Sequence, residues 1–278
     1  MLALRQATRS LLGPTYRRFR SGGVLLRNTL GLTQSEAALV CDAQRYWNQT
    51  RHARYHSNSH WQSGELFAGG DAWSELGAQH LAIYDAFARA LALSLPPARI
   101  VEWGCGGGAN AVHFAPRAET FVGVDVSQAS LDECGRQIAA AQAGTFQPVL
   151  IQTDRPEGAL RQIDGGCDLF LCTYVFEALP TPEYGLRLLT IARDLLTDEG
   201  VAMIQIKYRT AAWGTASRRW NYARNLASNT TYAIDEFWLA AEDRGLKPRM
   251  MTLMPWQPLV NDGRYAYVAL QKGGASAW

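Results

Sequence analysis

The chain has 278 residues, of which 47 % are hydrophobic and 19 % are charged, and its formal net charge is +2. This composition is that of an ordinary globular protein, and a charge so near zero does not favour nucleic acid or an anionic membrane as a partner. No apolar run reaches the ~20 residues that a transmembrane helix needs. The five cysteines form no C-x-x-C pair, so neither a disulfide framework nor a zinc knuckle is predicted, and free thiols favour a cytoplasmic location.

The first 35 residues form a basic segment with six arginines and no acidic residue. Such a composition is typical of a mitochondrial transit peptide, but it also suits an arm that lies on an anionic membrane or covers the active site of its own fold. We favour the intrinsic arm, and whether residues 1–32 are cleaved or membrane-associated stays open. The capping-box spacing of Thr33 and Glu36 then predicts a helix to about Trp47. A second, apolar helix is expected over 72–95, before a pair of prolines.

From residue 99 onward, short apolar strands alternate with helices, which indicates a mostly parallel α/β sheet covered on both faces. Strands are expected at 99–103, 120–125, 147–152, 168–173, 201–207, 248–254 and 264–271. Helices are expected at 109–116, 128–142, 157–164, 182–196 and 235–244. No helix separates the last two strands, so they must form a hairpin, and one edge strand should be antiparallel.

The most informative stretch is RIVEWGCGGGANAVHF, residues 99–114, where a predicted strand meets several glycines and then a helix. Glycines let a backbone approach a ligand closely, and the N-terminus of the next helix favours negative charge. The stretch also satisfies the dinucleotide fingerprint G-x-G-x-x-G/A, with Asp125 placed 21 residues after Gly104, where a ribose-binding acid should be. Glu102 disfavours a dinucleotide as the ligand, because its carboxylate would repel the negatively charged pyrophosphate. It suits instead a ligand with a cationic amine and a sulfonium, such as S-adenosylmethionine (SAM).

Four motifs in chain order resemble those of the class I SAM-dependent methyltransferase family, over roughly residues 98–271. VEWGCGGGAN is similar to its E/D-x-G-x-G-x-G motif, FVGVDVS to its second-strand motif, CDLFLCTYVFEALP to its fourth-strand motif, and ARDLLTDEGVAMIQI to its R-x-L-x-x-G-G entry into strand five. The resemblance implies a Rossmann-like sheet of seven mostly parallel strands with an antiparallel C-terminal edge hairpin. We therefore expect an N-terminal helical arm and substrate cap at 1–97 and a SAM-binding methyltransferase domain at 98–278.

The resemblance also implies which residues bind the cofactor. They are Glu102, Gly104, Cys105, Gly106, Asp125, Val126, Asp154, Cys172 and Thr173. Glu102 and the glycine turn would hold the methionine portion, Asp125 the ribose hydroxyls, and Asp154 the adenine amine. The backbone from Cys172 onward would pass close to the sulfonium.

Candidates for catalysis come from the segment 46–73 and from one departure from the family pattern. His52, His56 and His60 recur every four residues and would share one face of a helix, as metal ligands can. No acidic or cysteine ligand lies in register with them, so no metal is predicted. We expect His56 or His60 to accept a proton from the substrate. Glu177 is the third candidate, because the histidine that follows the corresponding glutamate in many family members is missing here.

Aromatic and basic residues predict the acceptor surface. In 208–232, arginines interleave with tryptophans and tyrosines, a pattern that suits a stacked sugar, an anionic group or single-stranded nucleic acid. The structural alternative is an exposed amphipathic helix that packs its aromatic side chains on the domain. The modest pI of 8.3 and the lack of an N/D-P-P-Y motif at the fourth strand disfavour nucleic acid. The predicted substrate-binding residues are Trp61, Tyr208, Trp213, Arg218 and Trp220.

These features predict a SAM-dependent O-methyltransferase that acts on a hydroxyl of a polar small molecule, such as a sugar or glycoside. The alternatives are N- or C-methylation of a natural product, and a catalytically silent partner subunit with the SAM-binding fold. A silent subunit would have no reason to keep Glu102, Asp125 and an uninterrupted glycine turn. The resemblance also leaves open a homodimer, in which the N-terminal arm closes over a partner subunit's site.

Overall fold

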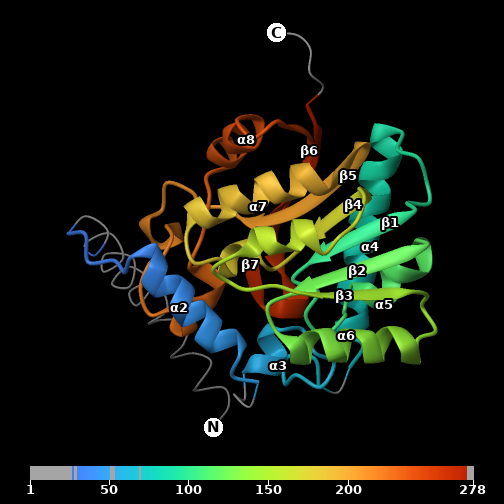
Figure 1. The fold of residues 1–278 in the computed structure, drawn as a ribbon. Helices are drawn as coiled ribbons and strands as arrows, with labels where there is room; N and C mark the ends of the chain where they lie inside the picture. Colours follow the sequence, from blue (N-terminus) through green and yellow to red (C-terminus); the bar gives the residue numbers. More distant parts are fainter. Residues whose placement is uncertain (1–26, 28–29, 51–53, 69, 274–278) are drawn as a thin grey trace, which may run out of the picture.

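A seven-stranded sheet forms the centre of the molecule (Figure 1). The computed structural model describes residues 27, 30–50, 54–68 and 70–273. Most of the arginine-rich arm, with its transit-peptide hypothesis, and His52 lie outside these described residues. The strands, in chain order, are β1 (Arg99–Trp103), β2 (Thr120–Asp125), β3 (Phe146–Leu150), β4 (Cys167–Cys172), β5 (Leu196–Lys207), β6 (Leu246–Gln257) and β7 (Asp262–Lys272).

The strand order is β3-β2-β1-β4-β5-β7-β6. Strands β1 to β5 are parallel to their neighbours, whereas β7 runs antiparallel to both β5 and β6. The prediction of a Rossmann-like sheet with an antiparallel C-terminal hairpin is therefore confirmed. In such a sheet, ligands bind outside the carboxyl ends of the parallel strands, where the order of strands reverses. Here the order reverses between β1 and β4.

In the part of the chain that the structure describes, five long helices accompany the sheet. They are α2 (Glu36–Trp47), α4 (Ala72–Leu91), α6 (Gln128–Ala140), α7 (Pro182–Leu195) and α8 (Ile234–Glu242). Helix α2 begins after Ser35, whose side chain accepts a hydrogen bond from the Ala38 N–H, so Ser35 and not Thr33 caps it. Helix α4 ends at Leu91 and not at the prolines, because Ala92 adopts a left-handed conformation with φ of 50°.

Two predicted helices differ from expectation, one in type and one in length. The segment 157–164 is a 3₁₀ helix, Pro156–Arg161, because a proline and a glycine leave too few residues for an α-helical turn to propagate. The helix after the glycines is reduced to α5 (Ala111–Phe114), followed by a 3₁₀ turn. A further short helix, α3 (Tyr55–Asn58), carries His56.

The two faces of the sheet carry separate apolar cores. Because side chains alternate along a strand, Val101 of β1 points into a core shared with α7 and α8, while Ile100 points into a core shared with α4, α5 and α6. Figure 1 shows α7 in front of the sheet and α4 behind it. Helix α4 thus packs on the sheet, although the predicted domain boundary between residues 97 and 98 assigns this helix to the N-terminal arm. That domain boundary stays a prediction.

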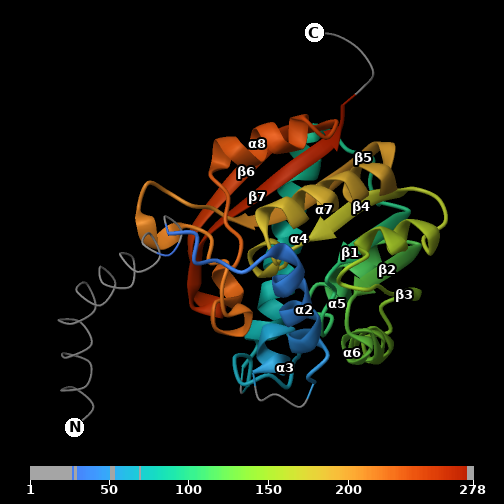
Figure 2. The same cartoon turned by 60° about the vertical axis from the view of Figure 1, so that its left-hand side comes forward.

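Helix α2 and the segment 208–232, here called the insert, lie side by side in both views (Figures 1 and 2). Leu39, Ala43 and Tyr46 of α2 are buried against Tyr222 of the insert. The Trp47 indole N–H donates to the Tyr222 hydroxyl at 2.9 Å. Thus Tyr46 and Trp47, which begin the predicted segment 46–73, pack against Tyr222 of the predicted acceptor segment 208–232.

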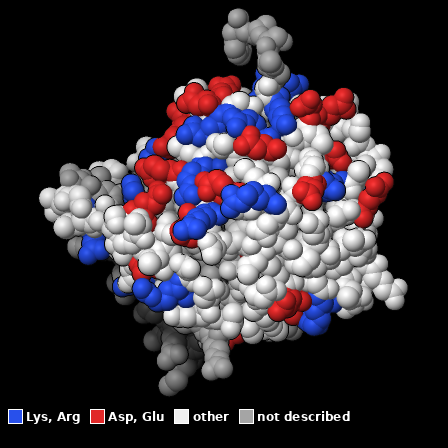
Figure 3. Space-filling view, in the orientation of Figure 1, with Lys and Arg blue, Asp and Glu red and all other residues white. Residues whose placement is uncertain are grey.

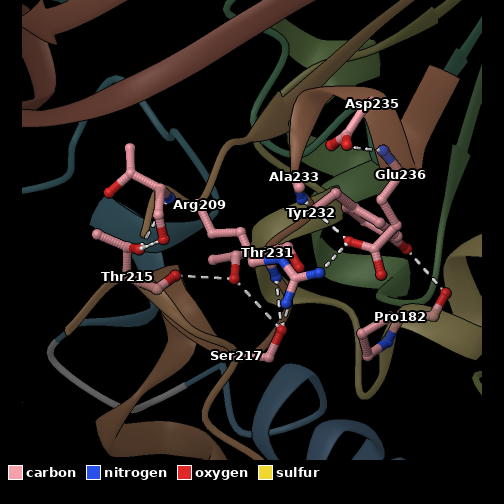
Figure 4. A network of polar contacts seen from close by, with 10 residues as sticks. Pro182, Arg209, Thr215, Ser217, Thr231, Tyr232, Ala233, Asp235 and Glu236 are labelled. Atoms are coloured by element: carbon pink, nitrogen blue, oxygen red, sulfur yellow. Dashed lines mark hydrogen bonds and ion pairs between the residues drawn. The ribbon is translucent and has the colours of Figure 1, made fainter. Parts of the chain in front are cut away.

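The insert contains no α-helix and consists of three 3₁₀ turns: Trp213–Thr215, Tyr222–Arg224 and Leu226–Ser228. Figure 4 shows the polar contacts within the insert and between the insert and α8. The Thr231 N–H donates to the Ser217 hydroxyl, and Arg209 pairs with Glu236 of α8 at 2.8 Å. Its first arginine is therefore engaged with α8.

Charged side chains of both signs are interspersed over α7 and α8 (Figure 3). There Arg187 pairs with Glu157 at 2.7 Å, and Arg193 pairs with Asp194 at 2.7 Å. Among the described residues, no helix is long and apolar enough to cross a membrane.

Candidate active site

A pocket opens at the carboxyl ends of β1, β2 and β4. Its walls combine the strand ends with α2, α3 and Tyr222 of the insert. The sequence-predicted site residues that line it are His60, Glu102, Gly104, Cys105, Gly106, Asp125, Val126 and Thr173.

The glycine turn, residues 104–108, brings the cap close to the loop. We use "cap" for residues 36–60 that the structure describes, namely α2, α3 and the residues around them. The Gly107 N–H donates to the Ser59 carbonyl at 2.7 Å. Gly106 has φ of 51°, and a Cβ placed there would collide with the same Ser59 carbonyl oxygen. Glycine is therefore required here for its conformation and for the approach of the cap backbone.

Asp125, at the end of β2, is held by backbone donors from both sides. One carboxylate oxygen accepts from the Gly106 N–H at 3.0 Å, and the other accepts from the Ser127 N–H at 2.9 Å. Burial raises the pKa of Asp125 to about 6, and the backbone hydrogen bonds work against that rise. The aspartate is thus fixed in orientation at the pocket wall, with remaining lone pairs on both oxygens for ligand hydroxyls.

Glu102, at the end of β1, is only 2 % exposed and has one partner in the described structure. Its Oε1 accepts from the Asn110 side-chain amide at 2.6 Å, whereas its Oε2 is buried without a hydrogen-bond partner. Burial, reinforced by the nearby charge of Asp125, raises the pKa of Glu102 to about 8. A buried carboxylate oxygen without a partner is costly. A hydrogen-bond donor supplied by a ligand at Oε2 would therefore remove this cost.

The end of β4 forms the opposite wall. Thr173 and Tyr174 line the pocket, and Tyr174 is held at φ of 58°, which is strained for a bulky residue. The ring of His60 packs edge-on against that of Tyr174, with centroids 4.8 Å apart. Burial, and secondarily the repulsion that a protonated His80 would exert, lowers the pKa of His60 to about 3. The His60 imidazole is therefore neutral at physiological pH and can accept a proton or a hydrogen bond.

The other predicted catalytic and cofactor residues lie outside the pocket lining. They are His56, Asp154, Cys172 and Glu177. The His56 ring stacks on the indole of Trp61 with centroids 4.2 Å apart, and Asp154 is exposed beside Arg155. Glu177 is 3 % exposed, and burial raises its pKa to about 7.

The predicted acceptor residues are likewise absent from this lining. Trp213 is 59 % exposed on the insert, and Tyr208 forms a bridge with Tyr232. The Arg218 side chain donates to the Gly214 carbonyl at 3.3 Å. Trp61 and Trp220 are partly buried, the former against His56. The structure therefore brings together the predicted cofactor residues except Asp154 and Cys172, but it does not bring the predicted acceptor residues to the same pocket.

Several pocket residues were not predicted from the sequence. They are Trp47, Ser59, Asn110, Tyr184 and Tyr222. The Tyr184 hydroxyl donates to the Thr153 carbonyl at 2.7 Å, and the Tyr222 hydroxyl donates to the Ala178 carbonyl at 2.5 Å. Asn110 did have a signal, because it follows the glycine turn by two residues. Among the described residues, no group of three or more potential metal ligands occurs.

The chain matches a family model described as a methyltransferase domain over residues 77–249. It therefore belongs to the methyltransferase domain family, and the expectation of a Rossmann-like, class I SAM-dependent methyltransferase is confirmed. SAM is accordingly its cofactor.

Two solved structures share the fold over most of their length. Magnesium protoporphyrin IX methyltransferase from Synechocystis PCC 6803, with S-adenosylhomocysteine bound, matches with a TM-score of 0.57 and 14 % identity. That match covers 84 % of this chain and 100 % of the other. A SAM-dependent methyltransferase from Clostridium acetobutylicum ATCC 824 matches with a TM-score of 0.55 and 12 % identity, covering 79 % of this chain and 99 % of the other. At such identities the likeness concerns the fold alone.

An O-methyltransferase from neocarzinostatin biosynthesis matches with a TM-score of 0.47 and 16 % identity. That match covers 63 % of this chain, and the chain spans about half of that protein, 49 % of its length. Comparison with curated proteins gives no match.

Proposed function

We propose that this methyltransferase transfers a methyl group to a hydroxyl of an uncharged small molecule. The observation that carries the proposal is one pocket that contains Glu102, Asp125 and the neutral imidazole of His60. The unpartnered oxygen of Glu102 supports binding of the methionine amine, and the oriented carboxylate of Asp125 supports binding of the ribose hydroxyls. When bound, SAM supplies an electrophilic methyl group.

His60 is our candidate for the residue that handles the acceptor proton. It is neutral and lies beside Tyr174, at the end of β4. An imidazole with so low a pKa is a weak base, so we assign it the role of accepting a hydrogen bond from the hydroxyl, with the proton moving as the new bond forms. Glu177 lies outside the pocket lining and His56 is stacked on Trp61, which favours His60 among the three candidates.

The lining of the pocket limits the acceptor. Among the described residues that line it, Glu102 and Asp125 are the charged ones, and none is a lysine or an arginine. An anionic acceptor would therefore have no counter-charge among the lining residues. Aromatic rings of Trp47, Tyr184 and Tyr222 offer flat apolar surfaces. A sugar or glycoside stays our prediction for the acceptor, as do a cytoplasmic location and a homodimer.

The proposal is tested by following a deuterated methyl group from labelled SAM into fractionated extract of the native cell, with mass spectrometry as the readout. Label on an oxygen of a carbohydrate or other neutral metabolite supports the proposal. Label on nitrogen or carbon favours the natural-product alternative, and label in protein or RNA contradicts a small-molecule acceptor. Binding of SAM without any labelled product supports a silent partner subunit.

Once an acceptor is identified, His60→Ala is expected to lower kcat by about 100-fold, the lower end of what a positioned proton acceptor contributes. The affinity for S-adenosylhomocysteine, measured by calorimetry, should change by less than about threefold. His56→Ala is the matched control, because this histidine lies outside the pocket lining. Equal kcat values for His60→Ala and the parent protein would contradict the assignment of His60.

A further inference from the structure

Behind Glu102 lies a chain of buried polar side chains that neither the sequence motifs nor the proposed function uses. Asn110 connects Glu102 to His80 of α4, and His80 connects in turn to Tyr267 of β7. The four residues are between 0 % and 6 % exposed. Buried polar groups are strongly constrained by the partners that satisfy them, so this chain fixes the orientation of each member.

The direction of the hydrogen bonds follows from the chemistry of the groups. The Asn110 side-chain NH₂ donates to Glu102 Oε1 at 2.6 Å, whether the carboxyl group is ionised or carries its proton on Oε2, and it also donates to the Thr173 hydroxyl oxygen at 2.9 Å. The carbonyl end of the Asn110 amide then faces His80 Nδ1 at 2.7 Å, and this nitrogen must carry the hydrogen.

The second nitrogen of His80 completes the orientation. Burial lowers the pKa of His80 to about 4, so the ring is neutral and Nε2 carries no proton when Nδ1 does. The Tyr267 hydroxyl, 3.1 Å away, therefore donates to Nε2. Both ends of the imidazole are thus engaged, and the tautomer of His80 is set by its neighbours.

The consequence for Glu102 is a division between its two oxygens. Asn110 engages Oε1, which leaves Oε2 as the buried oxygen without a partner. We propose that His80 and Asn110 form a positioning relay, which holds the Glu102 carboxylate so that Oε2 faces the amino group of the cofactor's methionine half. This inference rests on the cofactor placement given under the proposed function.

The relay predicts selectivity between two ligands. S-adenosylhomocysteine carries the amino-acid half that Glu102 would bind, whereas methylthioadenosine carries the adenosine and lacks that half. A purely structural role of His80, such as fastening α4 to the sheet, would affect both ligands alike. A positioning role affects S-adenosylhomocysteine selectively.

The experiment is calorimetric titration of the full chain and its variants with both ligands. Asn110→Ala should weaken S-adenosylhomocysteine binding by about 10- to 100-fold, the range for a lost hydrogen bond to a charged group, and should weaken methylthioadenosine by less than about threefold. His80→Leu should act in the same direction by about 10-fold. His80→Asn, which keeps a donor near the Nδ1 position, should recover most of that loss.

Asp125→Asn separates failure of the relay from failure of the cofactor placement. Because Asp125 is assigned to the ribose, which both ligands share, this variant should weaken both. If it does so while Asn110→Ala and His80→Leu weaken both ligands equally or neither, the relay is overturned and the cofactor placement stands. If Asp125→Asn leaves both affinities unchanged, the cofactor placement is overturned, and the relay with it.

Discussion

The glycine turn and the cap that covers it form one pocket but are held in different ways. The turn follows directly from β1, and residues close in sequence fix it: Asp125 accepts from the Gly106 N–H, and Asn110 donates to Glu102. The cap is held by contacts across the whole chain. Trp47 donates to Tyr222, which is 175 residues away, and the rest of the cap packs against the insert and the turn.

This difference shows which half of the pocket a short motif can specify. A carboxylate and several glycines on a strand and the turn that follows it are sufficient to specify the half of the pocket around Glu102 and Gly106. The other half needs residues from α2, α3, the end of β4 and the insert, whose meeting depends on tertiary packing.

The strongest test of how the halves are joined is Gly106→Ala. The new Cβ would meet the Ser59 carbonyl, a backbone atom, in addition to straining a residue with positive φ. We expect the free energy of unfolding in urea to fall by about 3 kcal/mol or more. Gly245→Ala is the matched control, because Gly245 also has a positive φ of 73° but its Cβ would meet only the Arg193 side chain at 3.4 Å. Gly245→Ala should lower the free energy of unfolding by about 1–2 kcal/mol. Equal losses in Gly106→Ala and Gly245→Ala would show that the contact between Gly106 and the cap is dispensable.

A comparison of two indoles tests the role of the cap and insert. Trp47→Ala should lower the free energy of unfolding by about 2 kcal/mol, because the side chain packs in the cluster between α2 and the insert. It should also weaken S-adenosylhomocysteine binding, since Trp47 lines the pocket. Trp213→Ala should change stability by less than about 0.5 kcal/mol, because this indole is 59 % exposed. A large loss of stability in Trp213→Ala, without one in Trp47→Ala, would contradict our inference that Trp47, and not Trp213, stabilises the packing of the insert.

The pH dependence of stability tests the buried carboxylate. The pKa of Glu102 is raised to about 8, so between pH 6.5 and 8 the folded protein binds more protons at this site than the unfolded chain does. Stability without ligand should therefore fall as the pH rises, by about 1–2 kcal/mol from Glu102 over this interval.

Thermal unfolding at several pH values, compared between the parent protein and Glu102→Gln, measures this contribution. The variant should show a smaller decline between pH 6.5 and 8. Glu177, with a pKa raised to about 7, acts in the same direction in both proteins, so the difference between them isolates Glu102. Identical slopes would mean that Glu102 is already ionised in the folded, ligand-free protein.

The sequence predicted the sheet, its antiparallel hairpin and the strand-end carboxylates, because these depend on local patterns. It could not predict His80 or Tyr267, since their roles depend on how α4 and β7 pack behind β1. Nor could it show that the insert forms 3₁₀ turns, because aromatic and basic residues at helical spacing fit several structures. His60 was a candidate by spacing alone, and its place beside Tyr174 depends on the cap closing over the turn.

The contact between the cap and the glycine turn has a consequence for how such a sequence can change over generations. In the cap, the contact is made by the backbone carbonyl of Ser59. In the glycine turn, Gly106 has no side chain, which leaves room for this carbonyl. A backbone carbonyl is present whatever residue occupies position 59, whereas the glycine cannot be replaced without strain. Residues of the cap can therefore diverge while the glycine at position 106 stays the same.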